Sequence, residues 1–285
     1  MRSRRTVLAI GVSVGLLALV AYVADIGAID LSHIRPGFLP LALAAYGGAL
    51  ILRAALLRHL ANATNDSRFT SWLSLAARHQ FLFTLAPSGS GDLTFPVLAN
   101  RIVGVTLGQG TALIAGTRLR DGCAILGLGS AGLAGVGLAA PLMWFIAISC
   151  GLALLFSDLT GRAVARLLRR TPSAAPSARW PAACLTLMIW LSASCAIAAG
   201  FAAAGHPLTI HETFIMLAGL NIVGALAISI GGLGIAEAGA AGVLVFLGLP
   251  LAEAAAIALM ARPILLLCNL AASVLLELCL RATAR

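Results

Sequence analysis

The chain has 285 residues, of which 60% are hydrophobic and 10% are charged, and its formal net charge is +9. An average soluble domain carries about 25% charged residues, so this composition excludes an ordinary soluble globular protein. All 19 basic residues are arginine, and most lie between apolar runs without the interleaved aromatic side chains of a nucleic-acid-binding surface. We therefore expect an all-α polytopic membrane protein that binds no nucleic acid.

The first apolar run, residues 6–24, follows arginines at positions 2, 4 and 5. Its length of about 19 residues matches the thickness of a bilayer and exceeds the apolar part of a signal peptide. We predict a first transmembrane helix with a cytoplasmic N-terminus, because positive charge favours the cytoplasmic side. Further apolar runs lie at 38–57, 70–86, 124–137, 141–156, 181–204, 213–230, 238–249 and 263–280. Together they predict about seven or eight transmembrane helices, with re-entrant or half-helical pieces at 95–105 and 111–117.

Segment 158–180 is rich in arginine and proline and divides the chain into a first membrane half (1–157) and a second (181–285). Its arginines lie at positions 162, 166, 169, 170 and 179. Arginines close to membrane ends mark cytoplasmic loops, so we expect this linker and the N-terminus in the cytoplasm. The predicted location is the cytoplasmic (inner) membrane of a bacterium.

Glycine-rich sequence ending in an acid interrupts the apolar sequence twice, at 87–92 and at 231–237. The acids are Asp92 and Glu237, and the glycines nearest to them are Gly89, Gly91, Gly232 and Gly234. Clustered glycines break a helix, and a charged residue at membrane depth costs roughly 2.5–3.5 kcal/mol. Lipid cannot satisfy the freed backbone groups, so we expect both breaks to face protein or a watery cavity.

The two breaks carry matched charges. Asp92 and Glu237 are 145 residues apart, and Arg118 and Arg262 are 144 apart. This spacing predicts a two-fold internal repeat, in parallel or inverted orientation, with breaks at corresponding places. Corresponding broken segments indicate a transporter site near the midplane of the membrane. We expect the acids to pair with the two arginines, because an unpaired charge in the membrane is costly.

Other polar residues within apolar sequence are candidates for the same substrate pathway. Arg101 lies in the polar piece 95–105, and Asn221 in the middle of 213–230 either lines the pathway or bonds between helices. Arg53 is expected to extend its head group to the membrane interface. Residues 78–80, Arg-His-Gln, indicate either an interfacial stretch or a polar interior. No catalytic constellation or metal-ligand spacing is present, so we expect no metal, no cofactor and no enzymatic activity.

Three short motifs resemble those of the flippase-like family formed by the transmembrane region of lysylphosphatidylglycerol synthases. They are 87–92, the Arg-Leu-Arg-Asp stretch at 118–121, and 231–237, and the resemblance covers about residues 10–280. Three positions depart from the family pattern: Asp92 stands for a glutamate, Thr117 for a glutamate and Ala236 for an arginine. The chain ends at Arg285, without room for the soluble aminoacyl-transferase domain, so we expect no synthesis of lysyl-lipid.

The resemblance implies a membrane translocase for a lipid or a lipid-linked intermediate with a polar or anionic head group. On this hypothesis, neutralising Glu237 abolishes transport while the protein still folds. The alternative is a non-transporting accessory, a scaffold for an enzyme of lipid or glycan-lipid biosynthesis, in which the charged pairs only organise packing.

Overall fold

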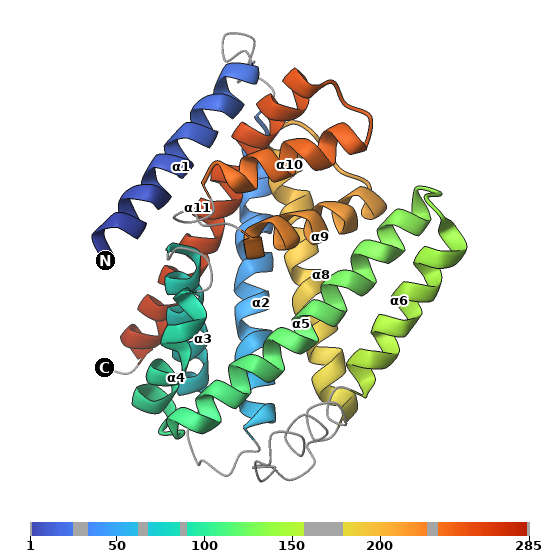
Figure 1. Ribbon diagram of the computed structural model, residues 1–285. Helices are drawn as coiled ribbons and strands as arrows, with labels where there is room; N and C mark the ends of the chain where they lie inside the picture. The colour runs from blue at the N-terminus through green and yellow to red at the C-terminus, as the bar shows by residue number, and fades with distance from the viewer. Residues whose placement is uncertain are drawn as a thin grey trace.

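The computed structural model describes residues 2–24, 34–61, 68–85, 90–156, 179–226 and 233–283, and within these ranges it is helical without strands. Figure 1 labels the helices. Their bounds are α1 (Arg2–Val23), η3 (Pro36–Phe38), α2 (Leu39–Leu60), α3 (Phe69–Leu85), α4 (Ser90–Val103), α5 (Leu107–Gly135), α6 (Ala140–Leu155), α8 (Arg179–Ala203), α9 (Ile210–Leu226), α10 (Ile235–Phe246) and α11 (Leu251–Thr283). The predicted all-α fold is confirmed.

Three helical stretches are long and apolar enough to cross a membrane, Pro36–Leu60, Trp180–Ala203 and Leu251–Thr283, and shorter apolar helices accompany them. Many large apolar side chains are exposed, such as Phe145 and Leu267 at 68% and 64%. Such surfaces suit lipid rather than water, because exposure of apolar area to water is unfavourable. The protein is therefore a helical membrane protein, and the number of crossings stays a prediction.

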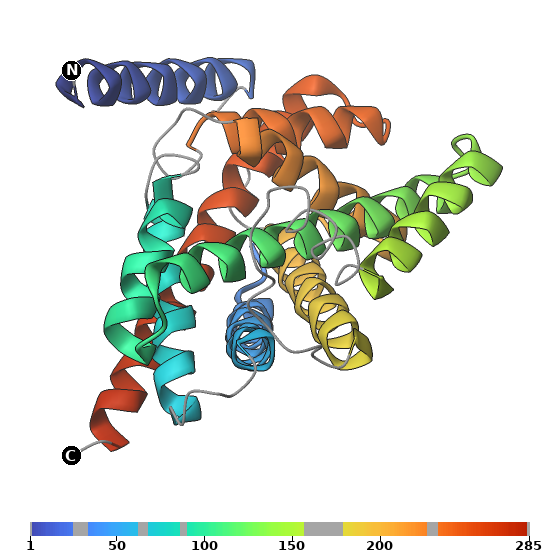
Figure 2. The same ribbon diagram turned by 60° about the horizontal axis from the view of Figure 1, so that its bottom comes forward.

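Helices α2 and α8 run side by side through the centre, while α1 and α6 lie at opposite edges (Figures 1 and 2). The two central helices are antiparallel. Leu56, near the end of α2, shares a buried cluster with Ala182, near the start of α8. Helix α11 packs against α2 and α3, and α5 packs against α8 and α9.

Two pairs of short helices flank this centre, α3 with α4 and α9 with α10. These helices have 17, 14, 17 and 12 residues, fewer than the roughly 20 that a full crossing needs. In each pair a long helix follows the second member, α5 with 29 residues and α11 with 33. The turn between α4 and α5 contains Gly104 at φ 74°, and the turn between α10 and α11 contains Gly248 at φ 101°. A positive φ favours glycine.

Each pair of short helices has its own buried apolar core. One core gathers Trp72 of α3 and Phe95 of α4 against α2 and α5. The other gathers Met216 of α9 and Leu244 of α10 against α8 and α11. Burial of large apolar side chains is the main favourable term in packing a helix that is too short to be stable alone.

Of two predictions about half-helices, one has different bounds in the structure and the other is wrong. The predicted half-helix 95–105 belongs to α4, which already begins at Ser90, so that Thr94 lies inside the helix and its hydroxyl donates to the Gly91 carbonyl at 2.7 Å. The predicted piece 111–117 is part of the continuous helix α5. A capping box starts α5 early, since Thr106 and Gln109 exchange hydrogen bonds between side chain and backbone.

Candidate functional site

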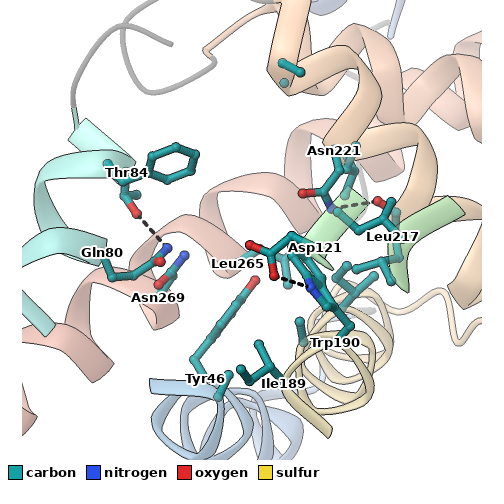
Figure 3. A pocket seen from close by; sticks show the side chains of 18 of the residues that line it. Tyr46, Gln80, Thr84, Asp121, Ile189, Trp190, Leu217, Asn221, Leu265 and Asn269 are labelled. Atoms are coloured by element: carbon teal, nitrogen blue, oxygen red, sulfur yellow. Dashed lines mark hydrogen bonds between the residues drawn. The ribbon is translucent and has the colours of Figure 1, made fainter. Parts of the chain in front are cut away.

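A cavity of about 670 Å³ lies among the central helices (Figure 3). Its wall is built from residues of α2, α3, α4, α5, α8, α9, α10 and α11, so both halves of the chain contribute. The polar and charged lining residues are Tyr46, Arg53, Gln80, Thr84, Asp92, Arg118, Asp121, Trp190, Asn221, Arg262 and Asn269.

Asp92 and Arg118 form a two-pronged ion pair at one side of the cavity. Asp92 lies in the first turn of α4, where a negative charge complements the helix dipole. The Arg118 guanidinium, from α5, donates from Nε to Oδ2 at 2.7 Å and from Nη2 to Oδ1 at 2.6 Å. It also lies over the Phe83 ring, and His79 places Nε2 3.2 Å from Asp92 Oδ1. The predicted pairing of Asp92 with Arg118 is confirmed.

Asp121 is the centre of a larger charged network. Arg53 of α2 donates from Nη1 to both of its carboxylate oxygens, at 2.9 and 3.1 Å. The Trp190 indole of α8 donates to Oδ1 at 2.8 Å, and Arg118 reaches Oδ2 at 3.3 Å. The Asp121 side chain is 3% exposed, so these donors replace the water that it has lost. Arg53 therefore points inward, and the prediction that it extends to the interface is wrong.

Glu237 follows a different pattern from Asp92. Its side chain is buried at the start of α10, and Oε2 accepts the backbone N–H of Gly234, which has φ 81°. This carboxylate satisfies one of the donors that a helix start leaves free. Among the described residues it forms no ion pair with Arg262, so the predicted second pair is not present. The acid bonds to its own helix terminus instead, three residues away.

Arg262 of α11 lines the cavity with a partly buried side chain. Within the described ranges its guanidinium has no hydrogen bond or ion pair to another residue. Three arginines and two aspartates line the cavity, which leaves one positive charge in excess when histidine is neutral. Arg262 supplies that excess, because Arg53 and Arg118 are engaged with the aspartates.

The remaining predicted site residues have different places in the structure. Asn221 lines the cavity, and its amide donates to the Leu217 carbonyl of its own helix at 2.8 Å, which favours the pathway interpretation over a bond between helices. Arg101 is exposed on α4 and does not line the cavity. Gly91 is buried where a Cβ would meet the Phe83 backbone at 2.5 Å, so it lets α3 and α4 approach. Gly89 and Gly232 lie outside the described residues.

The Arg-His-Gln sequence at 78–80 divides between the two alternatives, since His79 and Gln80 face a polar interior and Arg78 is exposed. Gln80 lines the cavity and His79 lies beside Asp92. Arg78 reaches across to α11, where Nη2 lies 2.6 Å from Glu277 Oε1 and Ser74 donates to Oε2 at 2.7 Å. These bonds fasten α3 to α11 at one end of the cavity wall.

The charged and polar side chains of the cavity offer hydrogen-bond donors and acceptors to a charged or polar group. In the part of the chain that the structure describes, no group of three or more acidic, histidine or cysteine side chains is placed to hold a metal ion. The charged residues instead form a continuous line, Arg53–Asp121–Arg118–Asp92, in which each acid is bound by at least one guanidinium. Such a line fixes the register of α2, α4 and α5 around the cavity.

A protein-family model described as the lysylphosphatidylglycerol synthase TM region matches residues 6–273. The match includes every residue that lines the cavity. No curated protein and no solved structure matches the chain.

Proposed function

The chain belongs to the family of the lysylphosphatidylglycerol synthase transmembrane region, and from this membership we propose that it moves a lipid or lipid-linked intermediate across the membrane. One observation carries the proposal: a cavity at the centre of the helices is lined by charged residues from both halves of the chain. Charged residues inside membrane proteins are costly and commonly mark a substrate pathway. Transport, rather than aminoacyl transfer to a lipid, is the activity that such a cavity supports.

We infer that the chain is an inverted repeat. Helices α1 to α5 correspond in order to α6 and α8 to α11, with equal lengths for α3 and α9 and a short helix before a long one in each set. The packing pairs also correspond, since α3 packs on α11 while α9 packs on α5. The antiparallel pair α2 and α8 then surrounds the two-fold axis. This correspondence favours a boundary at 136–139, before α6, over the predicted linker at 158–180.

Inverted repeats place transport sites at the interface between the repeats, near the midplane. Residues of both pairs of short helices border the cavity, which supports the proposal that it lies at such an interface. In the proposed mechanism a polar head group enters the cavity and exchanges contacts with Arg262 and the charged line while its acyl chains stay in lipid.

Orientation follows from the positive-inside rule. The end of α2 and the start of α8 share one side of the molecule, and Arg58, Arg68 and the arginines of 158–180 cluster in sequence at these ends. We propose that this side faces the cytoplasm, together with the N-terminus, in the inner membrane of a bacterium.

The test is a translocation assay in proteoliposomes that contain lipids with a fluorescent head group, with a membrane-impermeant quencher reporting their sidedness. Wild type is compared with Arg262→Gln, which removes the excess cation from the cavity, and with Arg101→Gln, an exposed arginine outside it. We expect rapid movement in wild type and Arg101→Gln and a strong loss in Arg262→Gln. All three proteins are first checked for monodispersity. Equal movement in protein-free vesicles and in wild-type vesicles overturns the proposal.

The second candidate is an accessory or scaffold for an enzyme of lipid or glycan-lipid biosynthesis. Its support is the line Arg53–Asp121–Arg118–Asp92, whose charges are already paired without a ligand, as in networks that only organise packing. It predicts that wild type moves no lipid class and that a biosynthetic enzyme co-purifies with it from native membranes.

A further inference from the structure

Both acids in the cavity are already bound by cationic or indole donors. Asp121 accepts from Arg53, Arg118 and Trp190, and Asp92 accepts twice from Arg118. Glu237 bonds to the backbone and does not line the cavity. An ammonium group entering the cavity therefore meets carboxylates whose charge is already balanced by guanidinium groups. Where it displaces a guanidinium, it replaces a bidentate bond by a single contact, which is unfavourable.

The excess charge in the cavity has the opposite sign. Arg262 lines the cavity, and its guanidinium has no partner among the described residues. A guanidinium presents donors in a planar fork that matches two oxygens of a phosphate. The cavity therefore offers the Arg262 guanidinium to an anionic group, whereas both of its carboxylates are already bound by arginines.

Neutral hydrogen-bonding groups lie in the same space. Figure 3 shows the Tyr46 side chain of α2 and the amides of Gln80 of α3 and Asn269 of α11 in the cavity. Gln80 donates to Thr84 at 3.3 Å, whereas the Tyr46 hydroxyl and the Asn269 amide have no hydrogen bond to a described residue. Amide and phenol groups both donate and accept, which is what the hydroxyls of a polyol require.

The volume is consistent with a head group alone. A cavity of about 670 Å³ lies within the range of roughly 300–1,000 Å³ common for small-molecule sites. Two acyl chains would remain outside it, in lipid.

From these observations we propose that the cavity binds a lipid head group made of a phosphate and neutral hydroxyls, and discriminates against a head group that carries an amine. Arg262 binds the phosphate, and Tyr46, Gln80 and Asn269 bind the hydroxyls. This assignment names the substrate class of the site and rests on the translocase proposed above.

The test measures binding without transport. Purified full-length protein in a neutral detergent is titrated with short-chain lipids, and the shift of its thermal unfolding midpoint reports binding. The lipids share acyl chains and differ in head group: phosphatidylglycerol, phosphatidylmethanol, phosphatidylcholine and lysyl-phosphatidylglycerol. Phosphatidylmethanol keeps the charge of phosphatidylglycerol and lacks its hydroxyls. Glycerol 3-phosphate tests the soluble phosphate ester without a lipid.

We expect phosphatidylglycerol to bind about tenfold or more tightly than the two lipids that carry a cationic nitrogen. Arg262→Gln removes this preference, while Arg101→Gln keeps it. Tyr46→Phe narrows the difference between phosphatidylglycerol and phosphatidylmethanol and retains the preference for anionic lipids. The hydroxyl part and the phosphate part of the site are thereby tested separately.

Equal or tighter binding of lysyl-phosphatidylglycerol overturns the assignment, as does unchanged selectivity in a well-folded Arg262→Gln protein. Equal protection by glycerol 3-phosphate identifies a soluble phosphate ester and overturns the lipid assignment. Selective binding of phosphatidylglycerol together with no movement in proteoliposomes supports the head-group assignment and overturns the translocase. The two proposals therefore fail in distinguishable ways.

Discussion

Arg118 of α5 binds Asp92 of α4 through two short hydrogen bonds, of 2.7 and 2.6 Å. The residues at corresponding spacing in the second half, Arg262 and Glu237, form no such pair within the described residues. Glu237 bonds to the Gly234 backbone, and Arg262 lines the cavity without a hydrogen bond or ion pair to a described residue. This difference between the halves is the reason why the cavity carries excess positive charge.

The ion pair between Arg118 and Asp92 gives the first prediction. Arg118→Gln leaves Asp92 and Asp121 with fewer donors, and we expect a loss of about 1–3 kcal/mol in the free energy of unfolding, since both partners remain partly open to the cavity. The measurement is denaturant or thermal unfolding of the detergent-solubilised protein.

A double variant separates charge from shape in this pair. Arg118→Gln combined with Asp92→Asn removes both charges, so it should recover part of the stability lost in Arg118→Gln alone. If the two substitutions simply add, the pair does not stabilise the fold in the way that its geometry indicates.

Asp121 is expected to matter more for folding than any other cavity residue. Asp121→Asn leaves Arg53 and Arg118 facing each other without a carboxylate between them, and we expect a loss of about 3–5 kcal/mol, enough to prevent purification of folded protein. Trp190→Phe removes only the indole N–H bond to the same carboxylate, at a cost of about 1 kcal/mol. Size-exclusion profiles and unfolding midpoints check both values. Similar behaviour of the two variants would contradict the central role of Asp121.

Glu237 was expected from the sequence to take part in transport, and its geometry now favours a structural role. Glu237→Gln keeps an oxygen that can accept the Gly234 N–H, so we expect folding and lipid movement close to wild type. Glu237→Ala loses this capping bond, at a cost of about 0.5–2 kcal/mol. The same proteoliposome and unfolding assays test both variants. Loss of transport in a stable Glu237→Gln protein would restore the transport role.

The sequence was sufficient for the long apolar helices. The runs 38–57 and 181–204 are uninterrupted and long enough to cross a bilayer, and they became α2 and α8 within a few residues. Thr209 and Glu212 form a capping box at the start of α9, and its hydrogen bonds join residues only three apart. Local signals of this kind depend only on neighbouring residues.

The partners of the charged residues could not be read in this way. Arg53 and Asp121 are 68 residues apart, and an arginine inside an apolar run is compatible both with extension to the interface and with an interior pair. The spacing of Asp92 and Arg118 predicted their pairing correctly, and the same argument failed for Glu237 and Arg262. The start of α10 offers Glu237 a backbone N–H only three residues away. The spacing between the acids and the arginines does not reveal this competing partner.

The contact between α5 and α9 gives the last prediction, because it depends on a glycine. A Cβ at Gly132 would lie 2.7 Å from the His211 backbone oxygen and 3.0 Å from side chains of Ile215 and Phe214. Overpacking of this kind costs roughly 1–3 kcal/mol, and the higher helix propensity of alanine offsets up to about 1 kcal/mol of that cost. We therefore expect Gly132→Ala to lower the free energy of unfolding by about 1–2 kcal/mol and to widen the cavity between the two helices.

Gly108→Ala is the matched control, since it lies on the same helix with nothing within 4 Å of its Cβ position. It should leave stability unchanged or slightly increased. Unfolding midpoints give the stability difference, and a cysteine pair or spectroscopic label across α5 and α9 gives their separation. Because α9 carries Asn221 and α5 carries Arg118 into the cavity, a wider separation should also weaken lipid movement in Gly132→Ala. Equal stability of the two variants would mean that α9 can shift to accept a methyl group, and that close approach at Gly132 is not required for the cavity wall.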